Sequence, residues 1–184
     1  SGKREQAYAP MWSPDNHHVA YSAWTRGGFR DLRYVDVRDG SYTEVTRDRA
    51  IDGGPAFSPD GESLYFHSDR TGISNIYRWK VSTGALEQVT NVLTGAYQPA
   101  VSPDGRTLAY VGYTHKGFDL FAMPLQEDRF LPALPYVDNR PPAPPIPTHK
   151  SYPSHDYNPL ETLRPRAYSL RTAPGNFGQS VSVS

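Results

Sequence analysis

The chain contains the sequence Pro10-Met-Trp-Ser-Pro-Asp-Asn16 and repeats it with small changes as Pro55-Ala-Phe-Ser-Pro-Asp-Gly61 and Pro99-Ala-Val-Ser-Pro-Asp-Gly105. The central serines stand at positions 13, 58 and 102, so they are 45 and then 44 residues apart. A constant period of this length is typical of proteins built from repeated structural units. Similar apolar runs and glycines follow each copy, so we interpret this part of the chain as one unit used three times.

The repeated unit has the sequence pattern of four short β-strands. Ser-Pro-Asp-Gly favours a tight turn, because proline fixes φ, aspartate bonds the local backbone and glycine accepts a left-handed conformation. Asp39-Gly40 and Thr83-Gly84 predict a second turn, between the third and fourth strands. Four antiparallel strands in about 45 residues are typical of a β-propeller blade. In the second copy the predicted strands are 56–57, 64–68, 76–81 and 86–90.

These residues also resemble a known family. The pattern Pro-x-aromatic-Ser-Pro-Asp-Gly, followed by an apolar-aromatic run and later by Ile-Tyr, resembles the TolB-type repeat, a WD40-like Pro-Asp repeat. It is also found in the propellers of tricorn protease and prolyl-oligopeptidase relatives. The resemblance covers about residues 8–125 and implies an all-β propeller with three four-stranded blades. We also expect Trp12 to be a core residue near the central channel and Trp79 to pack between blades. The matching residues are turn and core residues, so the resemblance specifies the fold more than the function.

The composition excludes several classes of partner and chemistry. The 184 residues carry 19 basic and 19 acidic side chains, so no long-range field attracts nucleic acid or an anionic membrane. Cysteine is absent from the sequence, which excludes disulfides, thiolate metal sites and cysteine nucleophiles. No apolar run reaches the 18 or so residues of a membrane helix. We therefore expect no nucleic-acid partner and no direct insertion of this segment into a membrane.

Three blades are few for a closed ring, because propellers typically have about 4–8. Two large blade faces would be left uncovered. Either further blades belong to a longer protein, or two chains pair as a homodimer into a six-bladed ring, the number that the resemblance suggests. In the third copy, Gln126-Glu-Asp-Arg-Phe-Leu-Pro132 replaces the turn glycine and fourth strand, so we expect a short or borrowed outer strand. The propeller is predicted to occupy residues 1–129.

The C-terminal part has a different composition. Prolines dominate residues 130–150, which we predict to be a semi-rigid polyproline linker that tethers rather than binds. Residues 151–184 are predicted to be an extended tail. Within it, Tyr157-Asn-Pro-Leu160, Thr162-Leu163 and Arg164-Pro-Arg166 resemble the junction between a TolB-type propeller and an outer-membrane barrel in bacterial surface-antigen proteins. That resemblance implies that the chain is the soluble part of a larger envelope protein.

No candidate catalytic or metal motif has the required context. Ser154-His155-Asp156 contains the residue types of a hydrolase triad, but neighbours on an extended chain point apart. Gly178-Gln-Ser-Val-Ser182 lacks the closing glycine of a nucleophile elbow around Ser180. His17-His18 lies in a predicted turn, without the spacing of a metal site. We expect no catalytic residue, no metal ligand and no cofactor, and therefore no enzyme.

The loops between the second and third strands remain as the candidate functional surface. They are charged, they contain glycine, and they should lie at one end of the ring, where a rigid scaffold presents binding loops. The simpler alternative is that Asp69-Arg70 and its equivalents only brace neighbouring blades. We predict a non-enzymatic module that binds a protein or peptide at the bacterial cell envelope, either periplasmic or associated with the outer membrane. The alternative is a regulatory propeller that gates a hydrolase whose catalytic domain lies elsewhere. The predicted binding residues are Arg26, Phe29, Arg30, Asp69, Arg70, His115 and Lys116.

Overall fold

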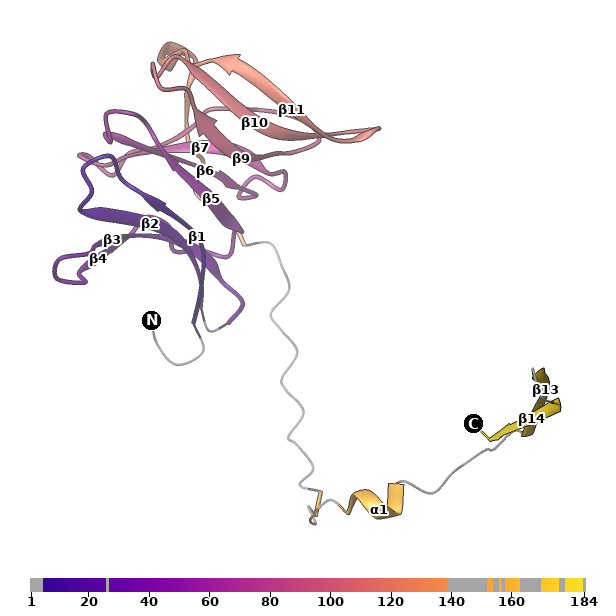
Figure 1. The fold of residues 1–184 in the computed structure, drawn as a ribbon. Coiled ribbons are helices and arrows are strands. Elements are labelled where there is room, and N and C mark those ends of the chain that lie inside the picture. Colours follow the sequence, from indigo (N-terminus) through magenta and orange to yellow (C-terminus); the bar gives the residue numbers. More distant parts are fainter. Residues whose placement is uncertain are drawn as a thin grey trace. The chain divides into compact units, whose positions relative to one another are not determined.

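Three antiparallel sheets follow one another along the chain, and their first strands, β1, β5 and β9, contact one another in succession (Figure 1). The structure is a computed structural model and describes residues 5–25, 27–138, 152–153, 156, 158–162, 170–175 and 178–183. The predicted all-β fold with three propeller blades is confirmed. The strands of the blades are β1 (Gln6–Trp12), β2 (His18–Trp24), β3 (Arg30–Asp36), β4 (Tyr42–Glu44), β5 (Asp52–Phe57), β6 (Ser63–Ser68), β7 (Asn75–Lys80), β8 (Leu86–Gln88), β9 (Ala96–Val101), β10 (Thr107–Thr114) and β11 (Gly117–Pro124).

The Ser-Pro-Asp-Gly turns join the first two strands of each blade, as predicted. In the second blade the amide of Ser58 donates to the carbonyl of Ser63 at 2.9 Å, and the amide of Gly61 donates to the carbonyl of Ser58 at 2.9 Å. The last turn residue is left-handed in all three copies, with φ of 57° at Asn16, 76° at Gly61 and 73° at Gly105. Glycine and asparagine tolerate that conformation better than other residues, which explains the residue types at this position.

The core consists of two layers of side chains, one on each side of the second blade. Side chains alternate along a strand, so Leu64 and Phe66 of β6 face the first blade while Tyr65 faces the third. Trp79 packs against the first blade and is buried, which confirms its predicted position between blades. The first layer contains Ala20, Leu32, Leu64, Phe66, Tyr77 and Trp79, and the second contains Tyr65, Ile76, Val89, Ala96 and Leu108.

The outer faces of the first and third blades are open to solvent. Trp12 in β1 is 58% exposed, so its predicted core position is wrong. The reason is that no described residue forms a blade in front of β1. On the other side, Phe118 and Leu120 of β11 are 67% and 77% exposed. The described residues therefore cover only one face of each terminal blade.

The segment after β11 joins the second blade instead of completing the third. It forms a short 3₁₀ helix, η1 (Glu127–Arg129), and then β12 (Leu131–Pro132), which pairs with β8. Arg78 of the second blade holds this segment through an ion pair with Glu127 at 2.6 Å and by stacking on Phe130 at 4.5 Å. The first compact unit extends to Arg140 and therefore includes this segment. The prolines between 141 and 147 lie outside the described residues.

The second compact unit is Pro141–Ser184, and the described residues of the tail predicted at 151–184 include regular structure. A helical turn, α1 (Pro159–Thr162), begins where the side chain of Asn158 accepts the amide of Leu160 at 3.1 Å. The strands β13 (Leu170–Gly175) and β14 (Gly178–Val183) form an antiparallel hairpin. Ser154 and His155 lie outside the described residues. Among the described residues, no helix has the length and apolar character needed to span a membrane.

Candidate functional site

Five loops meet at one end of the blades, because the strands of each sheet alternate in direction. We call this surface the loop end. It comprises the described residues of the connections between second and third strands, 25, 27–29, 69–74 and 115–116, and those between successive blades, 45–51 and 89–95. Loops of neighbouring blades are bonded to each other: the amide of Ile51 donates to the Asp69 carboxylate at 2.7 Å. Similarly, the hydroxyl of Ser74 donates to the carbonyl of Ala96 at 3.1 Å. The loop end is therefore a continuous surface across blades.

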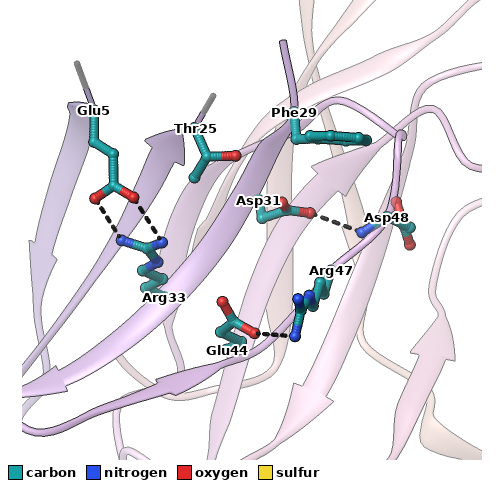
Figure 2. Close-up of a pocket in the computed structure, with 8 residues that line it drawn as sticks. All are labelled: Glu5, Thr25, Phe29, Asp31, Arg33, Glu44, Arg47 and Asp48. Carbon is teal, nitrogen blue, oxygen red and sulfur yellow. Dashed lines mark hydrogen bonds and ion pairs between the residues drawn. The ribbon is translucent and has the colours of Figure 1, made fainter. Parts of the chain in front are cut away.

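The first-blade pocket is a charged depression of about 480 Å³ in this surface (Figure 2). Arg33 of β3 forms a two-pronged ion pair with Glu5, with N–O distances of 3.1 and 3.4 Å. Arg47 pairs with Glu44 at 3.5 Å on the opposite side. Phe29 forms an apolar wall beside Asp31 and Asp48. The pocket is lined by Glu5, Thr25, Phe29, Asp31, Arg33, Glu44, Arg47 and Asp48, so acidic side chains outnumber basic ones.

A buried cluster of charges underlies the junction between the first and second blades. Carboxylate oxygens of Asp31, Asp48 and Asp52 lie within 4.8 Å of one another. The guanidinium of Arg70 lies 3.6 Å from Asp48 and from Asp52. Burial raises the pKa of Asp31 and raises that of Asp52 to about 6. Such carboxylates are the ligands that a hard cation prefers, but here Arg70 already supplies a positive charge.

The inter-blade pocket, of about 550 Å³, lies between the loops of the second and third blades. Burial and the charge of Arg30 lower the pKa of His67 to about 4, so its imidazole is neutral near pH 7. The ring Nδ1 accepts the amide of Gln98 at 3.5 Å, and the ring lies edge-on to Tyr97 at 5.7 Å. The remaining wall is partly apolar. It is formed by Arg30, Ile51, His67, Asp69, Gly72, Ile73, Ser74, Leu93, Thr94 and Tyr97.

A repeated bulge in the innermost strands shapes the base of this pocket. The strands β1, β5 and β9 each contain a left-handed residue at the same repeat position, with φ of 47° at Ala9, 59° at Gly54 and 48° at Gln98. The sheet register shifts beside each of them. His67 packs closely over the second bulge, since a Cβ atom on Gly54 would lie 3.0 Å from its Nδ1. The bulge therefore gives His67 its position.

Three of the predicted binding residues lie in the two pockets. Phe29 lines the first-blade pocket, and the guanidinium of Arg49 lies 5.9 Å from its ring centre. Arg30 and Asp69 both line the inter-blade pocket. The Nε of Arg30 donates to the hydroxyl of Ser22 at 3.1 Å, which fixes the side chain at the edge of the pocket. The structure thus brings these residues of two blades onto one surface.

The other predicted residues have different environments. Arg70 is only 8% exposed and braces the junction of two blades, the role that the alternative interpretation gave it. His115 and Lys116 are exposed at the tip of the turn between β10 and β11 and line neither pocket. Arg26 lies outside the described residues. Sequence reasoning missed His67, although a histidine at a repeat position that holds Ser22 and Val111 in the other copies was a usable signal.

The chemistry of the two pockets suits contact with a polypeptide. In the inter-blade pocket the hydroxyl of Ser74 bonds to a backbone carbonyl, so it is not oriented as a nucleophile toward His67. The inter-blade pocket combines one neutral imidazole and apolar side chains with the charged Arg30 and Asp69, whereas the first-blade pocket presents paired charges and one aromatic wall. Together they offer adjacent polar and apolar recognition on one rigid scaffold.

Comparisons with known proteins agree with this fold. A family model described as TolB beta propeller domain matches residues 1–144. An uncharacterized protein of Agrobacterium fabrum is 33% identical over 117 residues, which cover 64% of this chain and 40% of that protein. The Tol-Pal system protein TolB of Francisella tularensis subsp. mediasiatica is 34% identical over 86 residues, 44% of this chain and 19% of that protein. A solved structure of a TolB-like protein from Agrobacterium tumefaciens superposes with a TM-score of 0.60 and 29% identity, covering 65% of this chain and 46% of that one. The chain spans less than half the length of these relatives.

Proposed function

Because the chain belongs to the TolB β-propeller domain family, we propose that it is a non-enzymatic module that binds a protein partner at the bacterial cell envelope, in the periplasm. The observation that carries the proposal is the loop end, where a charged pocket and a partly apolar pocket lie on one surface. The name of the Francisella relative places that protein in a Tol-Pal system, so a Pal protein is the partner class to test first.

The composition of the pockets defines what the partner presents. Four carboxylates and two guanidinium groups line the first-blade pocket, which favours a basic side chain of the partner beside an apolar one. Phe29 would contact the apolar group. The inter-blade pocket, with neutral His67 and Tyr97, would accept a second apolar side chain beside the charged Arg30 and Asp69. The alternative function, a gating propeller of a hydrolase, is not favoured, because the matching family and the named relatives are of the TolB type.

A matched pair of charge reversals tests the binding surface. Glu44 lies in the first-blade pocket, and Glu62 is exposed in a turn at the opposite end of the blades. The purified soluble domain of a Pal protein is titrated into the chain by calorimetry. We expect Glu44→Arg to weaken binding by about tenfold or more, and Glu62→Arg to change it by less than about twofold. Equal effects of both variants, or no binding to the unaltered chain, would contradict the proposal.

We also propose that the open faces of the two terminal blades are covered in the functional assembly. The exposed residues include Met11, Trp12 and Trp24 on one side and Phe118 and Leu120 on the other. Soluble proteins seldom expose such apolar patches without an interaction partner. Both a second copy of the chain and further blades fit this requirement. The outer-membrane association suggested by residues 157–166 stays a prediction.

A further inference from the structure

In the described part of the chain, the outer edge of the third blade is an unpaired strand. Within the described residues β11 pairs only with β10, and Figure 1 shows it at the edge of its sheet. On the far side of β10, the amide of Tyr113 donates to the carbonyl of Gly95 at 3.3 Å, which sets the alternation of hydrogen bonds in the sheet. It follows that the backbone groups of Phe118, Leu120 and Ala122 point away from β10, toward the open edge.

The first two blades show which element belongs at this edge. In the first blade, the amide of Leu32 donates to a threonine hydroxyl at 2.9 Å, and its carbonyl accepts a valine amide at 2.9 Å. In the second blade, Ile76 makes the same two bonds at 2.8 Å each. We call this pair of bonds the Val-Thr clamp, formed by Val45-Thr46 in the first blade and Val89-Thr90 in the second.

Leu120 is the equivalent of Leu32 and Ile76, at the same 44-residue interval. Leu32 and Ile76 are fully buried, whereas Leu120 is 77% exposed. The chain places Ala133-Leu134 at the clamp position of this repeat, directly after a proline. Those residues are held on the second blade instead, where the amide of Ala133 donates to the carbonyl of Leu86 at 3.1 Å. In the described part of the chain, Leu120 therefore has the position that a Val-Thr clamp would bind, but no Val-Thr pair contacts it.

We propose that β11 is a strand-addition site that binds an extended peptide segment of a partner protein in antiparallel orientation. The segment resembles the fourth strands of this chain, Tyr42-Thr-Glu-Val-Thr46 and Leu86-Glu-Gln-Val-Thr90, and ends in a β-branched apolar residue followed by threonine or serine. Main-chain hydrogen bonds to an open sheet edge supply affinity in this binding mode, and alternate side chains supply specificity. The site is separate from the loop end, so its failure would leave the proposed function untouched.

A second copy of the chain fits this edge less well than a foreign strand does. Pairing of β11 with β11 of another copy would offer the sequence Gly117-Phe-Asp-Leu-Phe-Ala-Met-Pro124, which has no hydroxyl to accept the amide of Leu120. Its terminal proline also lacks a backbone donor. The clamp that the other two blades use would therefore remain unmade.

The fourth strand of the second blade provides the sequence of the peptide probe. A fluorescently labelled peptide with the sequence of residues 83–91, blocked at both ends, is titrated into the unaltered chain and followed by anisotropy. We expect saturable binding. Peptides carrying Val89→Pro, which removes the donor, or Thr90→Val, which removes the acceptor, should bind about tenfold more weakly or worse, the equivalent of one lost hydrogen bond. Equal affinity of all three peptides would overturn the proposal.

Amide hydrogen exchange locates the bound peptide without any change in the protein. Protection is expected at Phe118, Leu120 and Ala122, and little change at Asp119 and Phe121, which already face β10. Protection confined to β7 would mean that the peptide only replaces its parent strand, and would overturn the proposal. A Leu120→Pro chain, checked for its fold by circular dichroism, should no longer bind the peptide. If the peptide instead binds the unaltered chain only by converting a dimer into a monomer, the edge belongs to a second copy and the proposal fails.

Discussion

Asn16, Gly61 and Gly105 carry the left-handed backbone on which each blade turn depends. The sequence predicted this conformation, because glycine and asparagine are the residues that adopt it at low cost. A Cβ atom at Gly61 would meet Pro14 and Ser13 at 3.6 Å, which is an ordinary contact. The requirement at this position therefore concerns the backbone rather than space.

Two substitutions at Gly61 test whether the left-handed backbone conformation determines the stability of the turn. Gly61→Ala should destabilise the chain by about 1–2 kcal/mol, the cost of a left-handed conformation for an ordinary residue. Gly61→Asn should cost clearly less, because Asn16 occupies the same conformation in the first blade. Urea unfolding of both variants gives the comparison. Equal losses would show that the turn conformation does not determine the stability of this site.

Asp52 should make the stability of the chain depend on pH. Burial raises its pKa to about 6, so between about pH 4 and pH 6 the folded chain holds a proton that the unfolded chain releases. The stability contributed by this residue is therefore present at low pH and declines as the pH rises through that window. The free energy of unfolding of Asp52→Asn, relative to that of the unaltered chain, should therefore rise by about 2–3 kcal/mol between pH 4 and pH 7. Each unit of pKa difference is equivalent to about 1.4 kcal/mol.

Asp60 provides the control with the opposite sign. The hydroxyl of Ser58 and the amide of Glu62 donate to its carboxylate and lower its pKa. The stability that it contributes is present above the unfolded pKa and is lost as the pH falls. Asp60→Asn should therefore lose stability relative to the unaltered chain as the pH rises from 3 to 6. The same trend for both variants in thermal unfolding across this range would contradict the two assignments.

At the scale of the strands, the Val-Thr clamp is the contact that fixes the fourth strand. The buried hydroxyl of Thr90 accepts the amide of Ile76 at 2.8 Å and donates to the side chain of Asn75 at 2.9 Å. Thr90→Val keeps the shape and removes both bonds, so it should cost about 1–3 kcal/mol through an unpaired buried amide. Thr43→Val, at an exposed position of β4, should change stability by less than about 0.5 kcal/mol. Denaturant unfolding that shows no difference between the two would contradict the clamp.

Local sequence signals predicted the strands and turns of the blades. The pairing of β12 and the shape of the inter-blade pocket depend on non-local contacts, which the sequence did not reveal. Turn residues and alternating apolar residues specified the blades, because both act within a few residues. The pairing of β12 with the second blade depends on Arg78, some fifty residues earlier in the chain, which no local pattern identifies. The bulges at Ala9 and Gln98 likewise contain residue types that are not typical of a left-handed backbone, so the sequence does not predict them. For that reason the pocket around His67 was not predicted, whereas the loop end that contains it was.

At the scale of the whole molecule, the open faces are the main consequence of having three blades. The second blade is covered on both sides, while β1 and β11 are exposed along nearly their whole lengths. A closed ring would bury both terminal faces, and a two-fold pairing of identical chains closes with six blades and no uncovered face. Assembly should therefore precede or accompany any stable function of the loop end, which spans adjacent blades.

The molar mass of the chain in solution shows whether a second copy covers the terminal faces. Light scattering coupled to size exclusion, at several micromolar concentrations, should give a discrete dimer of twice the 20.5 kDa chain mass. Irregular association that grows with concentration would instead indicate that further blades normally cover the faces. A monodisperse monomer at all of these concentrations would contradict the claim that the terminal faces need a partner.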